Sequence, residues 1–293
     1  PVRHTAVAEP CVDPGSCAVC VRDPPALRCI VVRHSRSMYI DAAFPKYIHP
    51  SASKMTTRRW LLLSSSRDAA GTYLLHSAAA IQRTLGPSGK RVLFVPYAGV
   101  TISHSEYAAK AAIPFASLGH YLHSIDDASD PVAAVREADA IVIGGGNTFQ
   151  LLEILQNNGL VDAIRSRVHD GIPYIGWSAG AVVTAPTIAT TNGMPIVWPA
   201  SLRALGLIPF QINAHYTDFR QPDHQGETRE ERLQEYIAVN RTTRIIGLRE
   251  GCSLTIDDDA ISLNGDGSAP VFAYGSRRRD YACGEDISFL LRV

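Results

Sequence analysis

The segment 174–181 carries a serine in the pattern Gly-x-Ser-x-Gly, with Ser178 at its centre. An apolar run ends directly before this pattern and small residues follow it, which is typical of a strand that turns sharply into a helix with a serine at the bend. Gly176 and Gly180 let the backbone pass close to its neighbours. The following helix would point its first N–H groups at whatever the hydroxyl attacks. The segment alone is also compatible with a plain Gly/Ser turn.

A nucleophilic serine needs a general base, which is most often a histidine. Downstream of Ser178 the chain has two histidines, His215 and His224. His215 follows the strand-like run 210–214 and sits at its carboxyl end, the edge at which open α/β sheets build their sites. His224 lies in a polar loop and is more typical of a solvated side chain. We therefore predict that His215 is the base.

A carboxylate should hold the imidazole in place. Glu250 follows the apolar run 244–248 and precedes a glycine, so it too should lie at a strand end. Asp218, three residues after His215, is the competing candidate. The non-catalytic alternative for Glu250 is an ordinary surface turn.

Backbone N–H groups should bind the oxyanion. Ala179 provides one by its position after the serine, and the glycine run 144–146 could turn another toward a ligand. Asn147 or Thr148 could cap the helix that follows. Because the run lacks the lysine of a Walker loop and the spacing of a dinucleotide-binding loop, we prefer an oxyanion role to a phosphate site.

The alternation of strands and helices after residue 58 predicts the scaffold. Continuously apolar strands separated by helices indicate a parallel sheet covered on both faces, that is, a doubly wound, flavodoxin-like α/β fold. The order Ser178, His215, Glu250 argues against the α/β-hydrolase fold, in which the acid precedes the histidine. The C-terminal part is predicted to be β-rich. Strands are expected at 60–63, 91–97, 120–124, 138–143, 172–175, 245–248, 253–256, 260–263, 271–274 and 287–291, and helices at 73–85, 105–118, 148–156, 161–168 and 227–239, with a further helix from Asp130-Pro131.

Composition narrows the class of protein. The 293 residues include 28 basic and 28 acidic side chains, and 46% are hydrophobic. This balance is globular and gives no basic surplus for a nucleic-acid or membrane-surface partner. No apolar run reaches membrane-spanning length. The start does not resemble a signal peptide and the long middle contains no cysteine, so we expect a cytoplasmic protein.

Residues 1–54 differ from the rest, with seven prolines and little periodicity. We predict a flexible leader here, with 55–293 as the catalytic domain and Met55 as a plausible natural start. The alternative is a zinc site, although the spacing matches no standard finger. Its potential ligands would be His4, Cys11, Cys17, Cys20, Cys29 and His34.

Several longer motifs, in order along the chain, resemble the peptidase E family, the aspartyl dipeptidases of serine peptidase family S51. They are 144–152 (GGGNTFQLL), 174–181 (YIGWSAGA), 186–188, 190–197, 211–215 (QINAH), 226–230 (GETRE) and 246–251 (IGLREG). The resemblance covers about 58–293. It implies a class I glutamine-amidotransferase-like fold and hydrolysis of dipeptides with an N-terminal aspartate, without a metal or organic cofactor.

The resemblance also implies residue roles. Ser178 would be the nucleophile, His215 the base and Glu250 its orienter, with the N–H groups of Gly146 and Ala179 forming the oxyanion hole. A homodimer is implied as well. For the substrate's aspartate side chain we predict Arg229, because a guanidinium binds carboxylates in a forked geometry; an exposed helix residue is the alternative. Asn147 is a second substrate-binding candidate, and either Glu227 or Asp223 could hold the free amine.

Two positions depart from the family pattern. Gly193 stands where bacterial members often carry an aspartate, a rival third triad member, and a glycine has no side chain with which to orient an imidazole. This departure favours Glu250, with Asp218 second. Ala214 replaces the usual proline before the histidine, which removes no functional group.

Two other functions remain open at this stage. One is a cyanophycinase-like serine hydrolase on the same scaffold, which would need a broader cleft for a β-Asp-Arg polymer. The other is a non-catalytic binding protein for a small molecule. The three potential triad residues Ser178, His215 and Glu250 argue against the second alternative.

Overall fold

The computed structural model describes residues 19–23, 26–30, 57–223 and 225–292. Contacts divide the chain into two units, Pro1–Ser51 and Ala52–Val293. In the first unit, β1 (Val19–Asp23) and β2 (Ala26–Ile30) pair antiparallel, with Cys20 opposite Cys29. The other potential zinc ligands and the rest of the predicted leader lie outside the described residues, as does His224.

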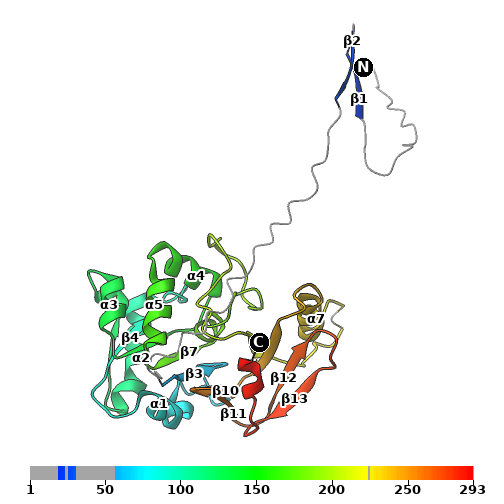
Figure 1. Ribbon diagram of the computed structural model, residues 1–293. Coiled ribbons are helices and arrows are strands. Elements are labelled where there is room, and N and C mark those ends of the chain that lie inside the picture. The colour runs from blue at the N-terminus through cyan, green and yellow to red at the C-terminus, as the bar shows by residue number, and fades with distance from the viewer. Residues whose placement is uncertain (1–18, 24–25, 31–56, 224, 293) are drawn as a thin grey trace. The chain divides into compact units, whose positions relative to one another are not determined.

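The second unit is built on a seven-stranded sheet in the order β11-β10-β3-β7-β6-β4-β5. The five strands from β3 to β5 are parallel, whereas β10 and β11 add an antiparallel edge. This mixed α/β architecture with a mostly parallel sheet confirms the predicted class (Figure 1). The strands are β3 (Arg59–Leu63), β4 (Arg91–Val95), β5 (Tyr121–Ser124), β6 (Ala140–Ile143), β7 (Tyr174–Trp177), β10 (Ser253–Asp257) and β11 (Ala260–Asn264).

Helices cover both faces of this sheet because its central strands are apolar on both sides. Along β4, Val92 and Phe94 face one layer, where α1 and α2 pack, whereas Leu93 and Val95 face the layer of α3, α4 and α5. The helical elements are η1 (Leu75–Ser77), α1 (Ala78–Leu85), α2 (His104–Ser117), η2 (Ile125–Asp127), α3 (Pro131–Glu137), α4 (Thr148–Asn157), α5 (Leu160–His169) and α6 (Ala179–Val182).

A second sheet has four strands in the order β13-β12-β9-β8. Its β8 and β9 are parallel, and the other pairs are antiparallel. Helix α7 (Arg229–Val239) packs Leu233 and Ile237 against this sheet, where they join Tyr216 and Phe272 in a small core (Figure 1). The strands are β8 (Gln211–Tyr216), β9 (Arg244–Arg249), β12 (Ser268–Ala273) and β13 (Arg279–Ala282).

The structure differs from the sequence prediction at a few elements. The strand predicted at 287–291 is wrong: Ser288–Leu291 forms the 3₁₀ turn η3, begun by Asp286, whose carboxylate accepts the N–H of Ser288. Strand β13 was not predicted. Helix α2, predicted from residue 105, begins at His104 and is capped by Ser103 in a capping box. In the part of the chain that the structure describes, no helix is both long and apolar enough to cross a membrane.

Candidate active site

Ser178 follows β7 and precedes the four-residue helix α6, as the Gly-x-Ser-x-Gly pattern predicts. Its φ is +51° and its ψ is −113°, a backbone conformation that non-glycine residues rarely adopt. Such a residue costs on the order of 1–3 kcal/mol and persists where its surroundings hold it. The N–H of Ser178 donates to the carbonyl of Leu63 on β3, which ties the bend to the neighbouring strand.

The two glycines of the pattern are required by close backbone approach. A Cβ on Gly176 would lie 2.3 Å from the carbonyl oxygen of Gly180, and one on Gly180 would lie 2.1 Å from the carbonyl oxygen of Ile143. Neither contact is possible for a real side chain. The first turn of α6 is therefore pressed against β6 and β7, and this packing fixes the direction of the Ser178 side chain.

His215 and Glu250 lie in line with the serine. The Nε2 atom of His215 is 2.9 Å from Oγ of Ser178, and its Nδ1 atom is 2.8 Å from Oε1 of Glu250. With the ring proton on Nδ1, the imidazole donates to Glu250 and accepts from the serine hydroxyl. The structure thus brings together the three residues predicted for the triad, in the geometry of a nucleophile, a base and an orienting carboxylate.

A buried serine that was not predicted as a site residue supports the backbone of His215. Ser64 follows β3, accepts the backbone N–H of His215 at 2.9 Å and donates to the carbonyl of Leu248 at 2.7 Å. His215 has a φ of +53° and sits where the register of β8 shifts between Ala214 and Tyr216. Ser64 therefore fastens the irregular backbone of His215 to both sheets. A serine after an apolar strand gives no sequence signal for such a role.

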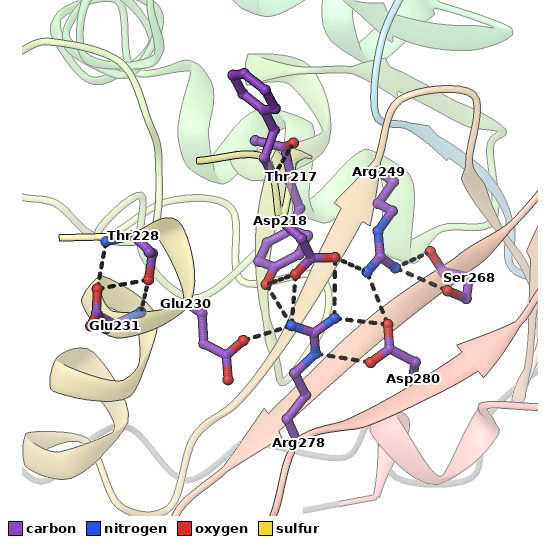
Figure 2. Close-up of polar contacts among 11 residues, drawn as sticks. Thr217, Asp218, Thr228, Glu230, Glu231, Arg249, Ser268, Arg278 and Asp280 are labelled. Carbon is purple, nitrogen blue, oxygen red and sulfur yellow. Dashed lines mark hydrogen bonds and ion pairs between the residues drawn. The ribbon is translucent and has the colours of Figure 1, made fainter. Parts of the chain in front are cut away.

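Asp218, the competing orienter, binds arginines instead. Its carboxylate contacts Arg249 and Arg278 (Figure 2) and accepts a hydrogen bond from the Tyr216 hydroxyl at 3.0 Å. The hydrogen bonds from Arg278 hold the pKa of Asp218 far below its usual range. No described contact joins Asp218 to His215.

These ion pairs form a cluster on the second sheet, which we call the arginine cluster: Asp218, Glu230, Arg249, Arg278 and Asp280. Figure 2 shows the guanidinium of Arg278 between the carboxylates of Asp218, Asp280 and Glu230, the last reaching over from α7. Arg249 also binds Asp280 and the carbonyl of Ser268. Because Arg249 directly precedes Glu250, the cluster secures the end of β9 from which Glu250 extends.

The predicted oxyanion donors lie beside Ser178. Ala179 is the first residue of α6, and the first N–H groups of a helix have no partner within it. Gly146 has a φ of +140°, and a Cβ there would lie 2.1 Å from the carbonyl oxygen of Ala98. The flanking N–H groups of Gly144 and Asn147 donate to Val95 and Ala98. The loop is thus pinned at both ends, and Gly146 lines the same cavity as Ser178.

This cavity has a volume of about 640 Å³. Ser178, His215 and Glu250 line it, together with Gly146 and Ala179. Other lining residues are Arg67, Asp68, Tyr107, Trp177, Thr191 and Gly193. Among the described residues, no group of three or more metal-ligating side chains could hold a metal ion.

The predicted substrate-binding residues lie outside this lining. Arg229 donates from Nη1 to the carbonyl of His215 at 3.1 Å, and burial lowers the pKa of its guanidinium. Asn147 caps α4 by accepting the N–H of Gln150 and donates to the carbonyl of Met194 at 2.8 Å. Both side chains therefore bind backbone groups, Arg229 that of His215 and Asn147 those of Gln150 and Met194.

Comparison with known proteins supports the family. The model of peptidase family S51 matches residues 60–264. The chain belongs to peptidase family S51. It is 40% identical over 235 residues to a peptidase E from Nostoc sp. (strain PCC 7120), which covers 80% of this chain and 97% of that protein. It is 43% identical over 232 residues to a peptidase E from Shewanella sp. (strain ANA-3), and this match covers 79% of this chain and 98% of that protein.

A solved structure agrees on the fold. The crystal structure of a peptidase from an acI-B1 actinobacterium superimposes with a TM-score of 0.58 at 22% identity, and the match covers 79% of this chain and 96% of that one. Membership of family S51 makes the chain a serine-type peptidase and confirms the resemblance inferred from the motifs.

Proposed function

We propose that this peptidase hydrolyses dipeptides with an N-terminal aspartate, through an acyl-enzyme on Ser178. The observation that carries the proposal is the continuous chain of hydrogen bonds from Ser178 through His215 to Glu250, at the wall of a cavity of about 640 Å³. The curated relatives named peptidase E support a peptide substrate.

The proposed reaction has two halves. His215 takes the proton of Ser178 as Oγ attacks the peptide carbonyl, and the oxyanion accepts hydrogen bonds from the N–H groups of Gly146 and Ala179. His215 then protonates the leaving amine, and an acyl-enzyme remains. Water, deprotonated by His215, releases the first residue and restores the serine. Glu250 stabilises the imidazolium in both halves.

Arg229 stays in the proposal as the residue that recognises the substrate's aspartate side chain, and Asn147 as a second substrate-binding residue. Arg229 uses Nη1 for the carbonyl of His215, which leaves other guanidinium donors for a carboxylate. Its contact with the backbone of the base supports a place at the edge of the site.

The decisive experiment is a panel of Asp-Leu, Glu-Leu, Asn-Leu and Ala-Leu offered to the wild type and to Ser178→Ala and His215→Ala. We expect the wild type to cleave Asp-Leu in strong preference, and each variant to lose at least about 10³-fold in kcat. Near-normal turnover by either variant would overturn the mechanism. Equal cleavage of all four dipeptides would overturn the aspartate specificity, as would a preference for β-Asp-Arg when it is offered beside Asp-Leu.

The remaining predictions concern the whole protein. We propose a class I glutamine-amidotransferase-like fold, a catalytic domain from residue 55 onward, a cytoplasmic location and a homodimer. The exposed apolar side chains of Met194, Ile196 and Trp198, in the loop next to Gly193 of the cavity, support an association surface close to the site. Sedimentation of the full chain tests the dimer, and a monomer at micromolar concentration would contradict it.

A further inference from the structure

The loop that follows β3, residues 64–73, brings two adjacent charges to the catalytic cavity. Arg67 and Asp68 both line the cavity. The loop is held by its own contacts: the Asp68 carboxylate accepts the N–H of Thr72 at 2.7 Å, and the backbones of Arg67 and Tyr73 form an antiparallel bridge. The two charges are therefore carried by a closed turn.

Contacts place Arg67 near Trp177, the residue before Ser178. Residues opposite each other in an antiparallel bridge share a face, so Arg67 lies beside Tyr73. The Tyr73 ring meets that of Trp177, the neighbour of Ser178, edge to face at 6.2 Å between centroids. Burial raises the pKa of Tyr73, and the positive charge of Arg67 opposes this rise. This effect agrees with a position of Arg67 beside Tyr73. One nitrogen, Nη1, donates to the carbonyl of Gly71.

The charges around the cavity single out Arg67. Among the described residues that line it, Arg67 is the one lysine or arginine, whereas Asp68 and Glu250 are carboxylates. The hydrogen bond from Thr72 lowers the pKa of Asp68, so this side chain is anionic at neutral pH. Within this lining, a substrate carboxylate is therefore repelled by two groups and attracted by one. Arg67 is its natural partner.

The order of the strands shows which end of the substrate meets Arg67. Ser178 ends β7, which lies between β3 and β6 in the sheet. Gly146 follows β6, whereas the loop of Arg67 follows β3. His215 is bound to that same loop through the hydroxyl of Ser64. Because the base must protonate the leaving amine, the leaving residue lies on the β3 side, next to Arg67.

We propose that Arg67 determines specificity by binding the α-carboxylate of the leaving residue. This inference rests on the proposed dipeptidase function and extends it. Only in a dipeptide does the residue after the cleaved bond carry a free carboxylate. A guanidinium in this position therefore selects dipeptides against amides and longer peptides, and it does so independently of the first residue.

The test compares Asp-Leu with Asp-Leu amide, which lacks only this carboxylate. In the wild type we expect a lower KM for the acid than for the amide. Arg67→Met should raise KM for Asp-Leu about 10- to 100-fold, with a much smaller change in kcat, and should leave the amide within about twofold. Arg67→Lys keeps the charge but loses the forked guanidinium, so its KM for Asp-Leu should lie between those of the wild type and Arg67→Met. The matched control is Arg83→Met on the exposed side of α1, with no effect expected on either peptide.

Calorimetry separates this proposal from the function on which it rests. Asp-Leu and its amide are titrated into Ser178→Ala with and without Arg67→Met, so that binding is read without turnover. An equal loss of affinity for acid and amide would overturn the role of Arg67, as would an equal rise in both KM values. A wild type that cleaves no Asp-Leu would overturn the dipeptidase function, and absence of binding would overturn both.

Discussion

At the residue scale, the site depends on two strained backbones that face each other. Ser178 and His215 both have positive φ, +51° and +53°, although neither is a glycine. The strain aims each side chain at the other, and the hydrogen bond of 2.9 Å between them results. Such conformations persist only where neighbouring contacts hold them. Those contacts are therefore the places at which single substitutions should act on the reaction.

Ser64 is the first such contact. Ser64→Ala removes the hydroxyl that accepts from the N–H of His215 and donates to the carbonyl of Leu248, and it leaves both groups buried and unpaired. We expect a loss of about 1–3 kcal/mol in the free energy of unfolding and a fall in kcat with little change in KM. Urea unfolding and Asp-Leu kinetics measure the two effects. Ser117→Ala, which removes a part-buried hydrogen bond from an exposed serine to the carbonyl of Pro114 in the same helix, is the control. Unchanged stability and kcat would contradict the assignment.

Arg229 is the second contact, and the structure gives it a role that the sequence did not predict. If it binds the substrate's aspartate, Arg229→Met raises KM for Asp-Leu more than for Ala-Leu. If it only holds the carbonyl of His215, kcat falls equally for both peptides. We expect both effects, with at least about a tenfold selective rise in KM. A change that is identical for the two peptides would remove Arg229 from substrate recognition.

The meeting of Ser178, His215 and Glu250 could be predicted because each lies at the end of a recognisable strand. Ser178, His215 and Glu250 all follow apolar runs, and the carboxyl ends of parallel strands collect site residues. Ser64 and Arg67 follow an equally clear strand, yet their roles depend on which strands become neighbours. A local sequence pattern does not show that β3 pairs with β7, or that β8 approaches the end of β3.

At the element scale, local sequence patterns predicted the strands that are buried on both faces, but they failed at the edges of the sheets and near the end of the chain. The apolar strands β3, β4, β6 and β7 were predicted within two residues at either end. Strand β13 was missed because it is polar and largely exposed at the rim of its sheet. The segment 287–291 is apolar enough to suggest a strand, but the carboxylate of Asp286 bonds two groups of Ser288 and starts a turn. Short-range capping outweighed the apolar pattern there.

The loop between β6 and α4 gives a prediction at this scale. Gly146→Ala places a methyl group 2.1 Å from the carbonyl oxygen of Ala98, so the loop must move and the N–H of Gly146 must turn away. We expect kcat to fall by about 10²–10³-fold, the usual cost of losing one oxyanion donor. The control is Gly159→Ala. Gly159, which precedes α5, also has a positive φ, but a Cβ there would meet no atom within 4 Å. If both variants lost activity to the same extent, general strain rather than the oxyanion would be the cause.

At the scale of the whole unit Ala52–Val293, the hydrogen bonds from Ser178 through His215 to Glu250 join two sheets. Ser178 extends from the large parallel sheet, whereas His215 and Glu250 extend from β8 and β9 of the smaller one. The site therefore exists only when the two sheets are docked and the smaller one keeps its shape. The arginine cluster, which joins β8, β9, β13 and α7, is well placed to provide that shape (Figure 2).

The arginine cluster makes the stability of the protein depend on pH. The hydrogen bonds from Arg278 depress the pKa of Asp218 in the folded state, and Arg278 and Arg249 also lower that of Asp280 against the effect of burial. A depressed pKa stabilises the fold above the unfolded value of about 3.9, and this stabilisation is lost as the pH falls through the folded pKa. Asp218→Asn should therefore be less stable than the wild type at pH 7. Below pH 4, the free energy of unfolding of Asp218→Asn should also fall less steeply with decreasing pH. The reason is that the variant takes up about one proton fewer, at most, when it unfolds.

Urea unfolding at pH 7, 5, 4 and 3 measures both curves. The matched control is Asp259→Asn. The carboxylate of Asp259 is 96% exposed and makes one long contact, to Arg58 at 3.5 Å. This control separates the effect of removing a surface charge from the effect of losing the cluster. Because both sheets must stay docked for turnover, Asp218→Asn should also lose Asp-Leu activity at a higher pH than the wild type on acidification. Parallel unfolding curves for the wild type and Asp218→Asn from pH 7 to 3 would show that the cluster does not couple protonation to the fold.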